Sequence, residues 1–227
     1  MTLPAAREAQ ALARKIESRY KSAQTLGATF LERYSEGRRT AEVESGRVFF
    51  SRPGRMRWEY EAPEKKLFLS DGRFVWFYVP SDRTVTRARV KGSTDWRTPL
   101  ALLTGKANLS RLCGRIEVLP DDIHRPAGHA VLRCIPRGEG DPGRAKGLSA
   151  GESPEGYFLE VLLEVDRTTG DLASVLVRQP GGVELEYRFA NWEFNPPLEE
   201  SLFRFATPIG VAIVEAPSES GGERRTH

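Results

Sequence analysis

Short runs of β-branched and aromatic residues, separated by turn sequences, dominate the hydrophobic pattern of residues 46–80. Alternation is clear in the second run, where Met56, Trp58 and Tyr60 share one face and Arg57 and Glu59 share the other. The segments between the runs contain RPG, EAPEK and SDG, which favour turns between antiparallel strands. The pattern therefore predicts a β-meander with strands at Arg47–Ser51, Met56–Tyr60, Lys66–Ser70 and Phe74–Val79.

The remaining chain predicts one N-terminal helix and several more strands. Residues from Ala5 to Tyr20 carry apolar side chains at helical spacing, so we expect an amphipathic helix that covers one face of the sheet. The first meander strand extends back to residue 38, and Gly46 within it indicates a bulge or the close approach of another element. Further strands are expected at residues 26–34, 85–90 (a polar edge), 115–119, 130–135, 157–165, 172–179, 183–194, 198–205 and 210–215.

About eleven antiparallel strands with two short or early helices predict a mainly β fold. We expect a half-closed, unclosed antiparallel β-barrel with helices over its open mouth. Residues 1–215 should form a single domain. Residues 136–156, rich in Gly, Pro, Ser and charge, are predicted to be a mobile loop insertion, and residues 216–227 a disordered tail.

The segment Thr98–Gly105 predicts a short helix, with Thr98 as its N-cap, Pro99 in its first turn and Gly105 as its stop. Leu100, Leu102 and Leu103 surround most sides of this helix. A helix that is apolar on most sides must be buried against another apolar surface.

Arg52 follows the strand that carries Val48 and Phe50, and it falls on their face. Because arginine is mostly exposed in proteins, an exposed rim position is the plainest interpretation. An inward position would require hydrogen-bond acceptors around the guanidinium, and the expected acceptors are backbone carbonyls of residues 98–105.

Cys113 and Cys134 are the two cysteines of the chain. A hairpin centred between Ile123 and His124 would set them opposite each other, close enough for a disulfide. Two buried free thiols are the alternative, and the pattern does not decide between them.

Composition and motifs argue against several function classes. The 34 basic and 31 acidic residues nearly balance, and basic residues do not interleave with the tryptophans, so a nucleic-acid surface is not expected. The sequence has no apolar run long enough to span a membrane. His124 and His129 lack the neighbouring ligands of a metal site, and no nucleophile or phosphate-binding motif occurs. We therefore expect no catalytic residue, no cofactor and no metal.

Two motifs in register carry a family resemblance: RPGxxxW at residues 52–58 and SDGxxxWxY at residues 70–78. Together with TPLALLTG at residues 98–105 and FRFATPIGVAIVE at residues 203–215, they resemble the periplasmic lipoprotein carrier family, LolA. The likeness extends from about residue 11 to residue 215.

The resemblance implies a hydrophobic cavity for acyl chains, a lid of short helices and an arginine that latches the lid. Arg52 takes the latch position. The implied cavity residues are Val48, Phe50, Met56 and Trp58 on the sheet and Leu100, Leu102 and Leu103 on the lid.

The implied function is that of a soluble periplasmic chaperone that carries lipoproteins from the inner to the outer membrane, exported by a signal absent from the given sequence. Its expected partners are acylated proteins, an inner-membrane lipoprotein-releasing transporter and an outer-membrane acceptor, with the carrier itself a monomer. A carrier of another lipid or glycolipid, or a regulatory protein-binding domain of related fold, is the alternative. An outer-membrane receptor of this fold would need an N-terminal lipobox cysteine, which the sequence lacks.

Overall fold

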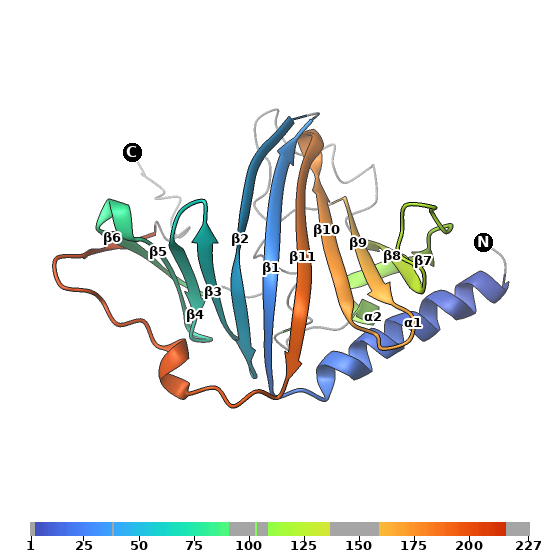
Figure 1. Ribbon diagram of the computed structural model, residues 1–227, viewed down its shortest axis with the longest axis horizontal. Helices are drawn as coiled ribbons and strands as arrows, with labels where there is room; N and C mark the ends of the chain where they lie inside the picture. Colours follow the sequence, from blue (N-terminus) through green and yellow to red (C-terminus); the bar gives the residue numbers. More distant parts are fainter. Residues whose placement is uncertain (1–2, 38, 91–102, 104–108, 137–158, 217–227) are drawn as a thin grey trace, which may run out of the picture.

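The computed structural model describes residues 3–37, 39–90, 103, 109–136 and 159–216. These residues form a 12-stranded sheet with strand order β12-β6-β5-β4-β3-β2-β1-β11-β10-β9-β8-β7 (Figure 1). In the described part, β12 and β7 are the two edges, so the sheet is unclosed. The expected half-barrel class is confirmed.

Most elements begin and end close to where the hydrophobic pattern places them, and β4, β5, β10 and β11 match residue for residue. The helices are α1 (Leu3–Lys21) and α2 (Leu109–Leu112), with 3₁₀ turns η1 (Pro80–Asp82), η4 (Pro180–Gly182) and η5 (Glu200–Phe203). The strands are β1 (Thr25–Glu36), β2 (Arg39–Ser51), β3 (Arg55–Ala62), β4 (Lys66–Ser70), β5 (Phe74–Val79), β6 (Thr84–Arg89), β7 (Cys113–Val118), β8 (His129–Pro136), β9 (Glu160–Asp166), β10 (Leu172–Gln179), β11 (Val183–Phe194) and β12 (Ala212–Glu215).

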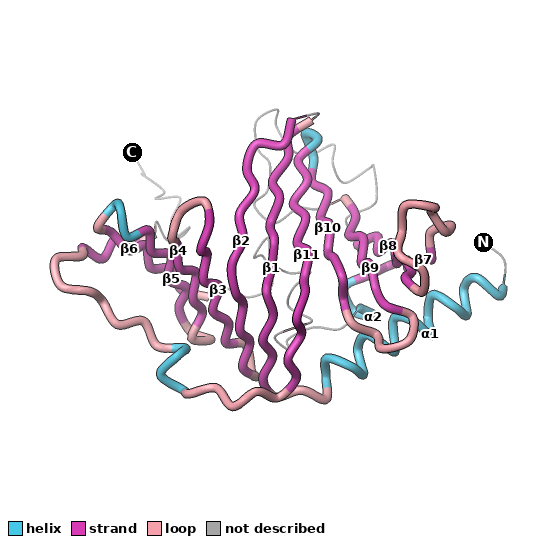
Figure 2. The backbone as a smooth tube through the Cα atoms, viewed as in Figure 1, coloured by secondary structure: helices cyan, strands magenta, loops and turns pink. Residues whose placement is uncertain are grey.

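The long strands β2, β1 and β11 form the centre of the sheet, and shorter strands form a wing on each side (Figure 2). Neighbouring strands pair antiparallel except β12, which pairs with β6 in parallel and sets Ile213 opposite Val85. The prediction that residues 85–90 form an edge is therefore wrong. The local pattern of β6 shows that one of its faces is polar, but it carries no information about a partner that lies more than 120 residues further along the chain.

Helix α1 lies along the wing formed by β7 to β9 (Figure 1). Its buried side chains lie on one face, as the helical spacing predicts: Ala9, Leu12, Ala13, Ile16 and Tyr20. Polar contacts hold the other side of the helix to the turn between β9 and β10. Lys15 Nζ donates to the carbonyls of Arg167 and Thr168 at 2.7 Å each, and Arg19 pairs with Asp171 at 2.7 Å.

The chain after β11 crosses to the opposite wing (Figure 1). The strand predicted at residues 198–205 is wrong, because Glu200–Phe203 forms the 3₁₀ turn η5. Packing explains the difference: Phe203 is buried, and Phe205 stacks on Trp76 with ring centroids 5.1 Å apart. Arg57 Nη1 also donates to the Leu202 carbonyl at 3.1 Å, which fixes the turn on the outer face of the sheet.

The outer face of β8 to β11 is polar. Glu160 lies between Arg133 and Arg178 and hydrogen-bonds to both, while Arg178 also contacts Glu184 at 2.8 Å. Although burial alone would raise the pKa of the Glu160 carboxyl, its bonds to Arg178 and Arg133 hold that pKa below its ordinary value. The apolar face of this wing therefore lies on the other side of the sheet.

Candidate functional site on the inner face of the sheet

Trp58 is the centre of the inner face, the side of the sheet that also carries Val48 and Phe68. Strand register places Val48 and Phe68 directly opposite Trp58 on its two neighbouring strands. The Trp58 ring also meets Phe30 at 4.8 Å and Tyr187 at 5.2 Å between centroids. Because cross-strand neighbours point to the same face, β1 to β4 and β11 present a continuous aromatic surface there.

The predicted cavity residues on the sheet come together on this surface. Phe50 lies opposite Met56, next to the Val48–Trp58 pair. Val48, Phe50 and Trp58 are 0–1% exposed in one apolar core, and the half-buried Met56 packs against it. The inner face is thus a packed core in this state, so any ligand would have to displace what covers it.

Of the predicted lid residues, Leu103 is described and is buried in the same core. Leu100 and Leu102 lie outside the described residues, as do most of the predicted helix at 98–105, the predicted loop beyond residue 136 and the predicted tail beyond residue 216. One predicted lid residue, Leu103, therefore packs against the inner face.

An apolar strip of the inner face remains partly open on the β5 wing. Phe77 lies opposite Phe68, on the Trp58 side of the sheet, and it is 40% exposed. Phe77 lies opposite Thr86 on β6, and Thr86 lies opposite Val214 on the edge strand β12, so Val214 is on the same side of the sheet. This strip leads from solvent toward the buried aromatic residues.

Arg52 contacts helix α1. Its Nη2 donates to the Tyr20 carbonyl at 2.6 Å, in the last turn of the helix, where the macrodipole favours a cation. Burial lowers the pKa of the Arg52 guanidinium, and its buried Nε has no hydrogen-bond partner among the described residues. The side chain is therefore half-buried beneath the helix rather than fully exposed at a rim. The acceptors expected for it in residues 98–105 lie outside the described chain, apart from Leu103.

Tyr20 joins the end of α1 to the sheet. Its ring contacts Trp192 and Phe194 at 5.3 and 5.7 Å, and its hydroxyl oxygen accepts a hydrogen bond from the Leu172 N–H at 2.8 Å. Burial is the main reason that the pKa of the Tyr20 phenol lies above its ordinary value. The Arg52 bond thus attaches to a helix end that is itself anchored.

Polar residues on the inner face were not singled out by the sequence pattern. Tyr60 donates to Glu32 at 2.7 Å, and Glu44, opposite Glu32 on β2, pairs with Lys66 at 2.5 Å. Burial alone would lower the pKa of Lys66, but its bond to Glu44 and the charges of Glu44 and Glu42 raise it. The sequence could have indicated Glu32, because it lies two residues after Phe30 in the same strand and therefore faces the same side of the sheet. The apolar surface therefore has a polar boundary along the centre of the sheet.

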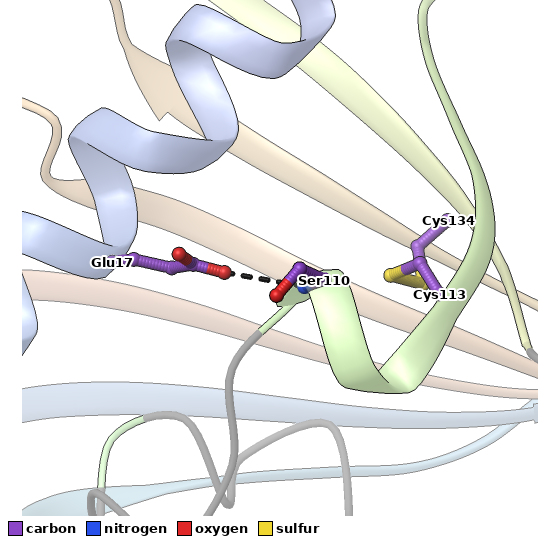
Figure 3. Close-up of a disulfide and its surroundings, with 4 residues drawn as sticks. All are labelled: Glu17, Ser110, Cys113 and Cys134. Carbon is purple, nitrogen blue, oxygen red and sulfur yellow. Dashed lines mark hydrogen bonds between the residues drawn. A yellow bond between two sulfur atoms is a disulfide. The ribbon is translucent and has the colours of Figure 1, made fainter.

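A disulfide joins Cys113 to Cys134 beside α2, and α2 is held to α1 where Ser110 N donates to Glu17 Oε1 at 3.2 Å (Figure 3). The disulfide considered from the sequence is therefore present, but the predicted strand register is wrong, because Ile116 lies opposite Cys134 and Cys113 lies opposite Pro136. A shift in the ladder between Cys113 and Arg115 brings the two sulfurs together. The bond attaches the junction between α2 and β7 to β8.

A separate hollow of about 320 Å³ lies on the outer face, between the sheet and the segment after η5. Its lining residues are Arg57, Leu67, Tyr78, Arg204, Phe205, Ala206 and Pro208. Within the described part of the chain, no group of three or more His, Cys, Asp or Glu residues is placed to hold a metal ion. No described helix has the length and apolarity needed to cross a bilayer.

The unclosed sheet, with an apolar inner face covered by an N-terminal helix, places the chain in the class of half-barrel proteins. A structure from Thermus thermophilus, described as an uncharacterized conserved protein, shares this fold with a TM-score of 0.55 at 14% identity, over 92% of this chain and 99% of that one.

Sequence comparisons narrow the class. The family model described as outer membrane lipoprotein carrier protein LolA matches residues 21–117. The outer-membrane lipoprotein carrier protein of Nitrosomonas europaea is 30% identical over 170 residues, covering 75% of this chain and 72% of that protein. The carrier of Methylococcus capsulatus is 29% identical over 203 residues, with 88% and 86% coverage. The chain belongs to the LolA family of lipoprotein carriers, as the sequence motifs indicated.

Proposed function

We propose that this protein is a soluble periplasmic chaperone that shields the acyl chains of lipoproteins and carries them from the inner to the outer membrane. The observation that supports this most is the apolar inner face centred on Trp58, in a chain of the LolA family. Its partners would be acylated proteins, an inner-membrane transporter that releases them and an outer-membrane acceptor. It would work by binding alone, without catalysis or a cofactor.

The physical requirement for such a carrier follows from the cost of exposing acyl chains. Each CH₂ group that leaves a membrane for water costs about 0.8 kcal/mol, so chains of ordinary length need an apolar enclosure in transit. The inner face offers apolar and aromatic side chains across five strands, from Phe68 on β4 to Phe189 on β11. The partly exposed Phe77 strip is our candidate for the entrance.

A carrier must also release its cargo. In the closed state the inner face is packed against itself and α1, so the free energy of opening is subtracted from the free energy of binding the acyl chains. The Arg52 bond to Tyr20 stabilises the closed state, which is the part that a latch would play. We propose Arg52 as that latch, and Leu103, with Leu100 and Leu102, as part of the lid.

We expect an environment-sensitive fluorescent fatty acid to bind at low micromolar concentration and to be displaced by an acylated peptide but not by the same peptide without its acyl chains.

Phe77→Ser should weaken binding of this probe several-fold, because it removes the exposed ring from the inner face. Val43→Ser is the matched control, since Val43 is 46% exposed on the outer face.

Fluorescence titration separates the outcomes. Displacement by a phospholipid or glycolipid, with none by the acylated peptide, would favour a carrier of another lipid. If the probe fails to bind at any accessible concentration, the proposed function is wrong.

A further inference from the structure

The indole N–H of Trp58 is a buried donor with nothing to donate to. Trp58 is fully buried, and its Nε1 has no acceptor among the described residues. By contrast, the Nε1 of Trp192 on the same face donates to the Leu172 carbonyl at 2.8 Å. A buried donor without a partner destabilises the folded state, so its presence at the centre of the site requires an explanation.

The surroundings of Trp58 explain why it has no partner. Its ring is enclosed by the rings of Phe30, Phe50, Tyr187 and Phe189, at centroid distances of 4.8 to 6.3 Å. The hydroxyls of Tyr60 and Tyr187 donate to Glu32 at 2.7 and 3.4 Å, and neither accepts a hydrogen bond from Trp58 Nε1. The donor therefore lies within hydrocarbon, where one good acceptor would interact strongly with it.

We infer that the Trp58 N–H is reserved for a carbonyl oxygen of the cargo, the ester or amide carbonyl that joins an acyl chain to its head group. This inference rests on the proposed function and adds a selectivity to it. Plain alkyl chains can fill the apolar face but cannot satisfy the donor. A site with a buried donor discriminates against an analogue that lacks the acceptor. Trp58 would then select acyl chains over alkyl chains and fix how deep the head group lies.

Trp76 provides a matched comparison within the same chain. Its Nε1 is also buried and without a partner among the described residues, but Trp76 lies on the outer face, stacked on Phe205. If an unpaired indole affected cargo binding only through stability, the two tryptophans would behave alike.

Three matched lipopeptides test the inference by calorimetric titration. The first carries two ester-linked palmitoyl chains on an S-glyceryl cysteine, the second two ether-linked hexadecyl chains, and the third adds an N-palmitoyl amide to the diether. We expect the parent to bind the diester about three- to tenfold more tightly than the diether, as one hydrogen bond would give. Trp58→Phe should remove this preference, and Trp76→Phe should keep it.

If the amide is the acceptor, the N-palmitoyl diether shows the Trp58-dependent gain instead of the diester. The preference within each variant cancels any general loss of packing. Should Trp58→Phe not fold, 3-benzothienylalanine at position 58 keeps the ring size while removing the N–H. Equal binding of all three ligands by the parent, or an unchanged preference in Trp58→Phe, overturns the inference. Failure of all three to bind overturns the proposed function itself.

Discussion

Replacing Gly46 with alanine should lower the free energy of unfolding by at least about 3 kcal/mol. A methyl group at position 46 would lie 1.9 Å from the Glu59 carbonyl oxygen and 2.8 Å from its carbon. Both atoms belong to the backbone of β3, so no side-chain rotation relieves the clash.

The location of Gly46 makes the effect larger. It lies between Phe30 and Tyr60 in the strand register, and these two rings meet across it with centroids 5.1 Å apart. The ladder between β2 and β3 also shifts register here, because Ser45 pairs with Ala62 and Gly46 with Tyr60, which leaves Glu61 of β3 as an extra residue. Both the bulge and the close approach that the sequence offered as alternatives therefore occur at this position. Moving β3 outward to admit a methyl group would separate Tyr60 and Trp58 from the core.

Gly27→Ala is the matched control. Gly27 is also a strand glycine, but a methyl group there would meet Phe49 and Glu193 at 3.6 and 3.7 Å, which is ordinary contact. Urea unfolding followed by tryptophan fluorescence measures both variants. A Gly46→Ala protein as stable as Gly27→Ala would show that β2 and β3 are not packed as described.

Arg52→Leu should hold a bound lipopeptide about tenfold more tightly and transfer it correspondingly more slowly to acceptor membranes. The closed state loses the charged hydrogen bond to Tyr20, so opening costs less and less is subtracted from the binding free energy. Stability should change little, because the substitution also removes a half-buried charge whose Nε is unpaired.

Arg52→Lys should fall between the parent and Arg52→Leu, because an ammonium keeps the charge but not the planar fork. Arg55→Leu is the control: Arg55 follows the same turn as the first residue of β3, but its guanidinium lies over Phe203 on the outer face. The measurement is the rate at which a fluorescent lipopeptide moves from the protein to vesicles. Transfer by Arg52→Leu at the parental rate would reduce Arg52 to a structural contact.

Local pattern was enough to predict the face of α1 and the bounds of most strands, because each of these depends on neighbours within a few residues. The alternation of Met56, Trp58 and Tyr60 predicted the inner face of β3, and Gly46 in an otherwise regular strand indicated a bulge or a close approach at that position. The family motifs then indicated Arg52 as a latch and Trp58 as a cavity residue.

The features that sequence did not predict depend on distant partners. The parallel pairing of β12 with β6 and the burial of Phe203 on the outer face join segments more than 120 residues apart. The Cys113–Cys134 bond forms through a register shift that no turn sequence specified. The bond between Arg52 and Tyr20 likewise required the packing of α1 against the sheet.

The central claim is that the inner face shields acyl chains in water, and the most direct test is to dilute an acylated lipoprotein from detergent into buffer with and without this protein. We expect native mass spectrometry and size-exclusion chromatography to show a soluble one-to-one complex that later yields its lipoprotein to added vesicles. The same lipoprotein lacking its acyl chains should form no complex. Aggregation of the acylated form regardless of this protein, or equal binding of both forms, would contradict the account.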